Sequence, residues 1–160
     1  MLDTRKIIYL HGLESNSQTY KAAVIRAIYP DLITPDFTGS LEERMKQLHP
    51  IPGSASNWTL IGSSYGGLMA ALFATQHPGQ VRKLILLAPA LMLPDFAEHL
   101  PEPIDVPTVI IHGRQDDVVP VGINKPLAEK VFRDLDYRLV DDDHRLHQTA
   151  KDLDWRSLIQ

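Results

Sequence analysis

The sequence predicts an α/β protein with a central, mostly parallel sheet of about six strands and helices on both faces. Short continuous apolar runs, typical of strands that are covered on both sides, occur at residues 6–10, 58–61, 83–88 and 108–112. Amphipathic or alanine-rich segments of helical length separate these runs, as in βαβ units. The chain of 160 residues suits a single domain over residues 1–160.

Capping residues and proline breaks set the expected boundaries of the helices. Ser17 or Thr19 can cap the first helix, and Ser40 with Glu43 three residues later predicts a capping box on the second. The run over residues 83–88 is the most apolar and should be the central strand. Further strands are expected at residues 32–34 and 137–140, and helices at 20–29, 41–48, from the residue after Ser64 to about Gln76, 121–132 and 148–158.

The composition excludes several classes of protein. A net charge of −4 and a pI near 5.9 argue against a nucleic-acid or anionic-membrane surface. The absence of cysteine excludes disulfides, thiolate metal sites and a cysteine nucleophile. Residues 1–6 lack the apolar region of a signal peptide, and no apolar run approaches the roughly 20 residues of a membrane span. We therefore expect a cytoplasmic protein.

One motif, Gly62-x-Ser64-x-Gly66, lies between a strand and a helix. In that context it is typical of a nucleophile elbow, a strained turn that exposes the serine hydroxyl above the sheet. The two glycines remove side chains that would otherwise collide in the turn. Ser63 is the competing nucleophile, but its neighbours two residues away are not glycines, so we interpret it as structural.

A serine nucleophile needs a base and an acid later in the chain. Of seven histidines, His144 and His147 follow a plausible acid loop. We favour His144, directly after the last strand, over His147, although a surface histidine beside an acidic run remains the alternative. For the acid we favour Asp116 over Asp117, because it is nearer to the end of its strand.

Stabilisation of an oxyanion requires two N–H donors. The backbone N–H of Tyr65, directly after the serine, supplies the first. The second should come from the loop after the first strand, where Leu13 is the candidate and Gly12 would permit a close approach. The alternative is that His11 and Gly12 only form a tight exit from the strand.

Together, these residues resemble the α/β-hydrolase superfamily, and within it the small, lid-poor bacterial serine esterases. They are Ser64 in its elbow, Asp116 before Val118-Val119-Pro120, His144 after the last strand, and His11-Gly12 after the first. The resemblance spans nearly the whole chain. It implies acyl transfer to water through a covalent acyl-serine, without a metal or a cofactor.

The chain departs from the superfamily in two ways. It is short, so the strands that begin the full fold should be missing. The segment between Ala88 and Pro107, where the superfamily places a lid, is too short for a separate lid domain. An apolar flap or pocket wall would be formed in this segment by Leu91, Met92, Leu93, Phe96 and Leu100, or else these residues pack over the edge of the sheet.

The predicted function is a serine hydrolase that cleaves small carboxylic esters, with a small-molecule ester as its substrate and no nucleic acid as a partner; the sequence does not give the oligomeric state. Acidic residues at 116, 117 and 141–143 outnumber the basic ones in the loops around the site, which would disfavour polyanionic substrates. Thioester or amide hydrolysis is the nearest alternative. A non-catalytic small-molecule binding module, or a protein-interaction domain using residues 91–100, would belong to another class.

Overall fold

A computed structural model describes residues 1–13 and 15–160 of the chain. Within those residues, five strands form one sheet in the order β1-β2-β3-β4-β5, and every neighbouring pair is parallel. The strands are β1 (Ile7–Leu10), β2 (Trp58–Ser63), β3 (Val81–Leu87), β4 (Thr108–Gly113) and β5 (Leu135–Val140). As the sequence predicts, the apolar strand β3 is central, and all the strands end at the same edge of the sheet.

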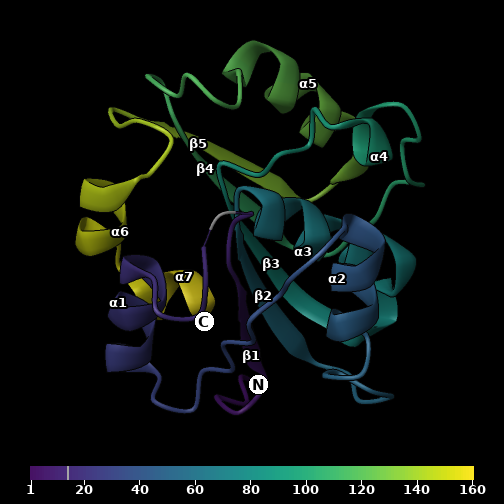
Figure 1. Cartoon of the computed structure of the whole chain (residues 1–160), viewed down its shortest axis with the longest axis vertical. Coiled ribbons are helices and arrows are strands. Elements are labelled where there is room, and N and C mark those ends of the chain that lie inside the picture. The colour runs from purple at the N-terminus through teal and green to yellow at the C-terminus, as the bar shows by residue number, and fades with distance from the viewer. Residues whose placement is uncertain (14) are drawn as a thin grey trace.

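Helices cover both faces of this sheet (Figure 1). One face carries α1, α6 and α7, and the other carries α2, α3, α4 and α5. The helices are α1 (Tyr20–Ile28), α2 (Leu41–Leu48), α3 (Tyr65–Gln76), α4 (Pro94–Ala97), α5 (Val121–Val131), α6 (His147–Asp152) and α7 (Trp155–Ile159), with a 3₁₀ turn at Pro78–Gln80.

The alternation of side chains along the strands builds two separate cores. In β1, Ile7 and Tyr9 pack with the α1, α6 and α7 side, whereas Ile8 and Leu10 pack with the α2 to α5 side. All four side chains are buried, because successive side chains of a strand point to opposite faces and both faces are covered. This double burial explains the continuous apolar runs in the sequence.

The predicted helix caps are confirmed where the hydrogen bonds can be followed. The Thr19 hydroxyl accepts from the N–H of Ala22, so Thr19 rather than Ser17 caps α1. Ser40 accepts from the N–H of Glu43, whose carboxylate accepts from the N–H of Ser40, which completes the capping box of α2.

The expected strand at residues 32–34 is reduced to a single bridge, so the described sheet has five strands instead of about six. Ile33 accepts from the N–H of Tyr9 and donates to the carbonyl of Ile7. Pro30 and Pro35 flank this short piece, and proline has no N–H with which to extend a ladder.

The expected helix over residues 148–158 is divided into α6 and α7. Leu153 between them is extended, with φ of −62° and ψ of 139°. Asp154 then caps a new helix by accepting from the N–H and the hydroxyl of Ser157. Trp155 is the buried anchor that we expected, and its indole N–H donates to the carbonyl of Ala150.

Between β3 and β4 the described chain has one helix, the four-residue α4, and no lid domain. The segment lies directly against the core of the α2 to α5 face, where Leu91 and Phe96 are completely buried. No helix in the described ranges is long and apolar enough to cross a membrane.

Two glycines at matched positions provide a test of the packing between α3 and β1. Gly66 and Gly122 are each the second residue of a helix. A Cβ atom at Gly66 would lie 2.1 Å from the carbonyl oxygen of Leu10, whereas one at Gly122 would meet nothing within 4 Å. We expect Gly66→Ala to lower the free energy of unfolding by about 3 kcal/mol or more, because neither backbone can move away easily.

Gly122→Ala is the control, which should be neutral or stabilising by up to about 1 kcal/mol, since alanine restricts the unfolded chain. Urea denaturation of both variants gives the comparison. Equal stability of the two variants would show that α3 does not depend on this close approach.

Candidate active site

Ser64 occupies the sharp turn between β2 and α3. Its φ of 55° and ψ of −112° lie outside the conformations that residues other than glycine usually adopt. Such a conformation costs on the order of 1–3 kcal/mol and persists only where the surroundings hold it. The N–H of Ser64 donates to the carbonyl of Leu87 in β3, and its carbonyl accepts from Ala90, so both backbone groups are fixed.

The glycines around Ser64 are required by close contacts between backbones. A Cβ at Gly62 would lie 2.4 Å from the carbonyl oxygen of Gly66, and one at Gly66 would meet β1. Gly67, which the motif does not include, is equally constrained, because its Cβ would lie 2.8 Å from Pro89. These contacts support the steric interpretation of the turn and add a third glycine to it.

The structure brings Ser64, His144 and Asp116 together in a line of hydrogen bonds. The Ser64 hydroxyl lies 3.0 Å from Nε2 of His144, and Nδ1 of His144 lies 2.8 Å from Oδ2 of Asp116. Because the carboxylate can only accept, Nδ1 carries the proton, and Nε2 of the neutral ring accepts from Ser64. The Asp116 side chain is completely buried and that of His144 is 20% exposed.

The loops that carry Asp116 and His144 are joined beyond the ends of β4 and β5. Arg114 N–H donates to the carbonyl of Val140 at 2.8 Å, and Gln115 N–H donates to that of Asp142 at 3.1 Å. Gly113 lets the two backbones approach, since a Cβ there would lie 2.2 Å from the Asp142 carbonyl oxygen. The parallel pairing of the last two strands therefore places the acid beside the histidine.

Asp116 is held as an anion by four donors. Its Oδ1 accepts from the N–H groups of Val118 at 2.9 Å and Val119 at 2.7 Å, and its Oδ2 faces two imidazoles. Burial opposes ionisation, but the hydrogen bonds from Val119, His144 and Val118 outweigh it, so the pKa of Asp116 lies below its ordinary value. The sequence Asp116-x-Val118-Val119 thus supplies both the carboxylate and part of its stabilisation.

The second imidazole is that of His112, which we had assigned only to a strand. Its Nε2 lies 3.1 Å from Oδ2 of Asp116 and 2.9 Å from the carbonyl of Val119, so this nitrogen carries the proton. Its Nδ1 accepts from the Tyr137 hydroxyl at 2.6 Å, and that hydroxyl accepts from Asn124 at 3.1 Å. A buried chain of hydrogen bonds therefore supports Asp116 from behind.

The protonation states of His112 and Tyr137 follow from burial. Burial lowers the pKa of His112, although its hydrogen bonds to Val119 and Asp116 act in the other direction. Burial also raises the pKa of Tyr137 to about 12, so its hydroxyl keeps the proton that it donates. The sequence contained one signal for these hydrogen bonds, a histidine in the mostly apolar strand β4.

The two residues expected to donate to an oxyanion, Tyr65 and Leu13, line the same cavity as Ser64. Tyr65 is the first residue of α3, and the first N–H groups of a helix have no acceptor within the helix. Leu13 and Gly12 line the same cavity as Ser64. A Cβ at Gly12 would lie 3.7 Å from Ser63 and 3.8 Å from Ser64, which are ordinary contacts, so the close approach that we expected does not require glycine here.

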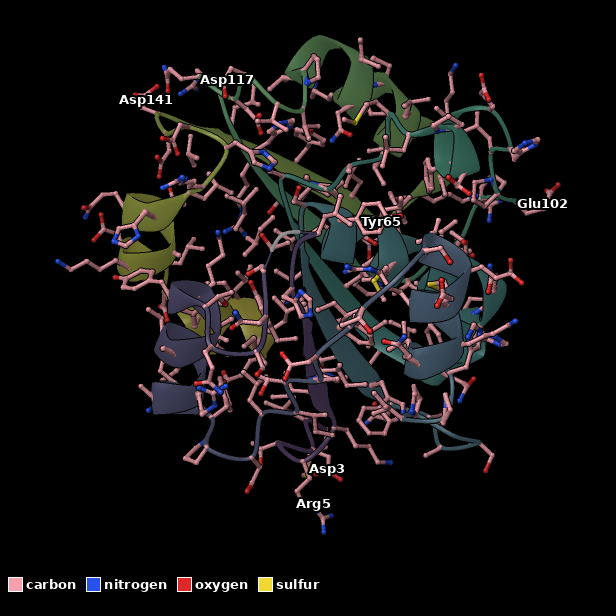
Figure 2. All side chains as sticks on the ribbon, viewed as in Figure 1. Asp3, Arg5, Tyr65, Glu102, Asp117 and Asp141 are labelled. Carbon is pink, nitrogen blue, oxygen red and sulfur yellow. The ribbon has the colours of Figure 1, made fainter. Side chains whose placement is uncertain are left out.

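The alternative residues take no part in the hydrogen bonds that join Ser64, His144 and Asp116, although Ser63 and His147 line the same cavity. Ser63 ends β2 and is buried, beside Tyr9. Asp117 is exposed and projects outward at the periphery of the molecule (Figure 2). His147 begins α6 and stacks on Tyr20 with a distance of 4.0 Å between the ring centroids.

A cavity of about 720 Å³ opens beside Ser64 and His144. Of the five residues expected in a flap or pocket wall, Met92 and Leu93 line this cavity. Leu91 and Phe96 do not, because both side chains are completely buried in the core of the α2 to α5 face. Ala90, which the sequence did not suggest, also takes part in the wall.

The charge around the cavity also differs from expectation. The acidic loop residues do not face it: Asp141 pairs with Arg114 at 2.8 Å and projects outward (Figure 2), while Asp142 accepts from the N–H and hydroxyl of Thr149. The charged side chains among the described lining residues are Lys21 and Arg145, both basic. Sequence position alone could not show which way these side chains turn.

The described residues contain no cluster of three or more histidine and acidic side chains arranged to hold a metal ion. The groups near Ser64 can instead transfer a proton from a hydroxyl to an imidazole and hold the resulting charge.

Comparison with known proteins agrees with this fold. A family model described as "Serine aminopeptidase, S33" matches residues 36–103. A Xanthomonas campestris pv. campestris protein of the alpha/beta hydrolase superfamily is 27% identical, with a TM-score of 0.81 over 98% of each chain. Est1E from Butyrivibrio proteoclasticus, solved with ferulic acid bound, is similar in fold, with a TM-score of 0.73 and 15% identity over 96% of this chain and 89% of that one.

Among curated proteins, a "Probable 1-acylglycerol-3-phosphate O-acyltransferase" from Oryza sativa subsp. japonica is 54% identical over 35 residues. The matched segment is 22% of this chain and only 8% of the rice protein. The fold and the order of its elements define a hydrolase-type α/β protein. The chain has the fold of the α/β-hydrolase superfamily.

The chain of hydrogen bonds behind Asp116 can be tested by removing one hydroxyl. Tyr137→Phe leaves Nδ1 of His112 and the amide of Asn124 without their partner, so the free energy of unfolding should fall by about 1–3 kcal/mol. Chemical denaturation measures this, with Tyr20→Phe as the control because Tyr20 is 39% exposed. Equal stability of both variants and the wild type would contradict the role of the Tyr137 hydroxyl.

The lowered pKa of His112 predicts how stability depends on pH. From the ordinary histidine value of about 6.5 down to the lower folded value, the unfolded chain binds a proton that the folded protein does not. The free energy of unfolding should therefore decrease as the pH falls below about 6.5. Asp116 contributes little in this window, because its carboxylate is ionised in both states.

Nitrogen-15 NMR of the histidine rings, combined with urea denaturation at several pH values, checks this prediction. In the folded protein, His112 should stay neutral with its proton on Nε2 at pH values where the urea-unfolded chain is protonated. A folded His112 that titrates at or above about pH 6.5 would contradict it.

Proposed function

We propose that this protein is a serine hydrolase that cleaves small carboxylic esters through an acyl-serine intermediate. The observation that carries the proposal is the strained Ser64 hydroxyl, 3.0 Å from Nε2 of a histidine whose other nitrogen is 2.8 Å from a buried carboxylate. A serine becomes nucleophilic when such a base takes its proton, and a carboxylate fixes the tautomer of that base.

In the first step, the Ser64 oxygen attacks the acyl carbonyl while its proton passes to Nε2 of His144. The imidazolium that forms is stabilised by Asp116, whose lowered pKa keeps it ionised. The bond between the serine oxygen and the acyl carbon forms, and the carbonyl π electrons move to the oxygen. Backbone N–H groups of Tyr65 and Leu13 are the proposed donors to this oxyanion.

Collapse of the tetrahedral intermediate expels the alcohol, which takes the proton from His144. Water then attacks the acyl-serine with the same histidine as base, and the acid leaves with Ser64 restored. Neither step needs a redox partner or a metal. The cavity beside Ser64 supplies the space in which a small acyl or alcohol group can lie.

Esters are favoured over other acyl compounds for two reasons. The structurally similar Est1E was solved with ferulic acid, a carboxylic acid, bound. An ester also has a better leaving group than an amide, so this arrangement cleaves it more readily than an amide. Thioester or amide hydrolysis on the same residues remains the second candidate, and a non-catalytic binding module is the candidate from another class.

A fluorophosphonate probe tests the nucleophile directly. The folded wild-type protein should gain one adduct at Ser64, located by peptide mass spectrometry, and Ser64→Ala should gain none. The rate of ester hydrolysis should fall by about a thousandfold or more in Ser64→Ala. Residues of such a catalytic unit act together, so the loss of one removes most of the rate enhancement.

Ser63→Ala is the matched control, because it removes the neighbouring hydroxyl without touching His144, and it should still be labelled. Labelling that persists in Ser64→Ala and disappears in Ser63→Ala would contradict the proposal and show that Ser63 is the nucleophile. Folded protein that resists the probe altogether would favour the binding module.

A further inference from the structure

Two basic side chains face the cavity from the side of the sheet that carries α1 and α6. Lys21 lies in the first turn of α1, and Arg145 directly follows His144. Neither is paired with a carboxylate in residues 1–13 and 15–160. Within the same described ranges, the lining includes no aspartate or glutamate.

The ammonium group of Lys21 is partly desolvated. Burial lowers its pKa, and Arg145 lowers it further, while the charges of Asp142 and Asp143 raise it. Asp142 is engaged with Thr149, and Asp143 accepts from the backbone N–H of Arg145, so neither reaches Lys21 as a partner. An ammonium that is half-buried and has no partner among residues 1–13 and 15–160 gains from an anion in the cavity, which would restore the interactions lost with water.

The apolar part of the lining comes from the other side of the sheet. Ala90 and Val119 belong to the core of the α2 to α5 face, and Met92 and Leu93 pack against that core. In Figure 1 the segments that carry these residues and the helices α1 and α6 lie on different sides of the strand ends. The cavity thus has a basic side and an apolar side, with Ser64 and His144 also in its lining.

We propose that Lys21 and Arg145 form an anion subsite, and that the substrate is an ester carrying a single carboxylate in its acyl or its alcohol part. This inference rests on the proposed ester hydrolase and names its substrate class. The carboxylate lies between the two cations, and the apolar remainder of the ester lies against Met92 and Leu93. One negative charge fits better than two, because Asp142 and Asp143 already oppose the charge of Lys21.

Matched ester pairs test the subsite. For a carboxylate in the acyl part, the mono-para-nitrophenyl ester of glutaric acid is compared with para-nitrophenyl pentanoate. For a carboxylate in the leaving group, para-butyryloxybenzoate is compared with para-butyryloxybenzamide. In the pair whose carboxylate reaches the subsite, kcat/KM should be about tenfold higher for the anionic ester than for the neutral one. This anion-to-neutral ratio should fall as salt is added, because the charges are partly exposed.

Lys21→Met and Arg145→Gln should each lower the anion-to-neutral ratio about tenfold, whereas Lys21→Arg should retain most of it. Arg133→Gln is the control, since Arg133 pairs with Asp105 on the surface and does not line the cavity. Circular dichroism verifies that each variant is folded, and Arg145, which is exposed, keeps the test available if Lys21→Met does not fold.

A ratio near one in both pairs, or a ratio that Lys21→Met and Arg145→Gln leave unchanged, would overturn the subsite. Faster cleavage of a doubly charged phosphate-bearing ester than of the carboxylate would overturn the single charge. If no ester is cleaved, the proposed function fails, but the subsite is still decided by NMR titration of Ser64→Ala with monomethyl glutarate. If monomethyl glutarate binds to Ser64→Ala but not to the double variant with Lys21→Met, the subsite is supported. If it does not bind to Ser64→Ala, the subsite is overturned.

Discussion

The close approach of α3 to β1 is the contact on which the candidate site depends. Gly66 lies against the backbone of Leu10, and a single methyl group there would come within 2.1 Å of a carbonyl oxygen. The first turn of α3 can lie over the strand ends because of this approach, and Ser64 directly before it has φ of 55° and ψ of −112°. The strain at Ser64 is maintained by this backbone packing together with the hydrogen bonds of its own N–H and carbonyl groups.

A second constraint lies beneath Asp116. A buried carboxylate is costly unless its lone pairs are satisfied, and here four donors satisfy them. Two come from its own loop, one from His144 and one from His112, which is itself held by Tyr137. The geometry at Ser64 thus continues through hydrogen bonds into the core between β4, β5 and α5. We regard His112 as a group that keeps this carboxylate ionised and oriented.

Much of the fold could be predicted because the signals were local. Double burial of the strands produces continuous apolar runs, and the capping box at Ser40 and Glu43 depends on residues three apart. The errors arose where a local signal was incomplete. Residues 32–34 have strand composition, but only Ile33 pairs. The last predicted helix is divided because Asp154 caps a new helix, which the sequence pattern did not indicate.

The sequence by itself determined the order of the elements and the turn at Ser64, because glycine spacing and apolar runs act over a few residues. Only the tertiary structure decided which way side chains face. It buried Leu91 and Phe96, turned Asp141 and Asp142 from the cavity, and left Lys21 facing it. These choices depend on contacts between segments far apart in the chain, so no local pattern encodes them. The sequence pointed to a reactive serine, and the fold defined the charge of its surroundings.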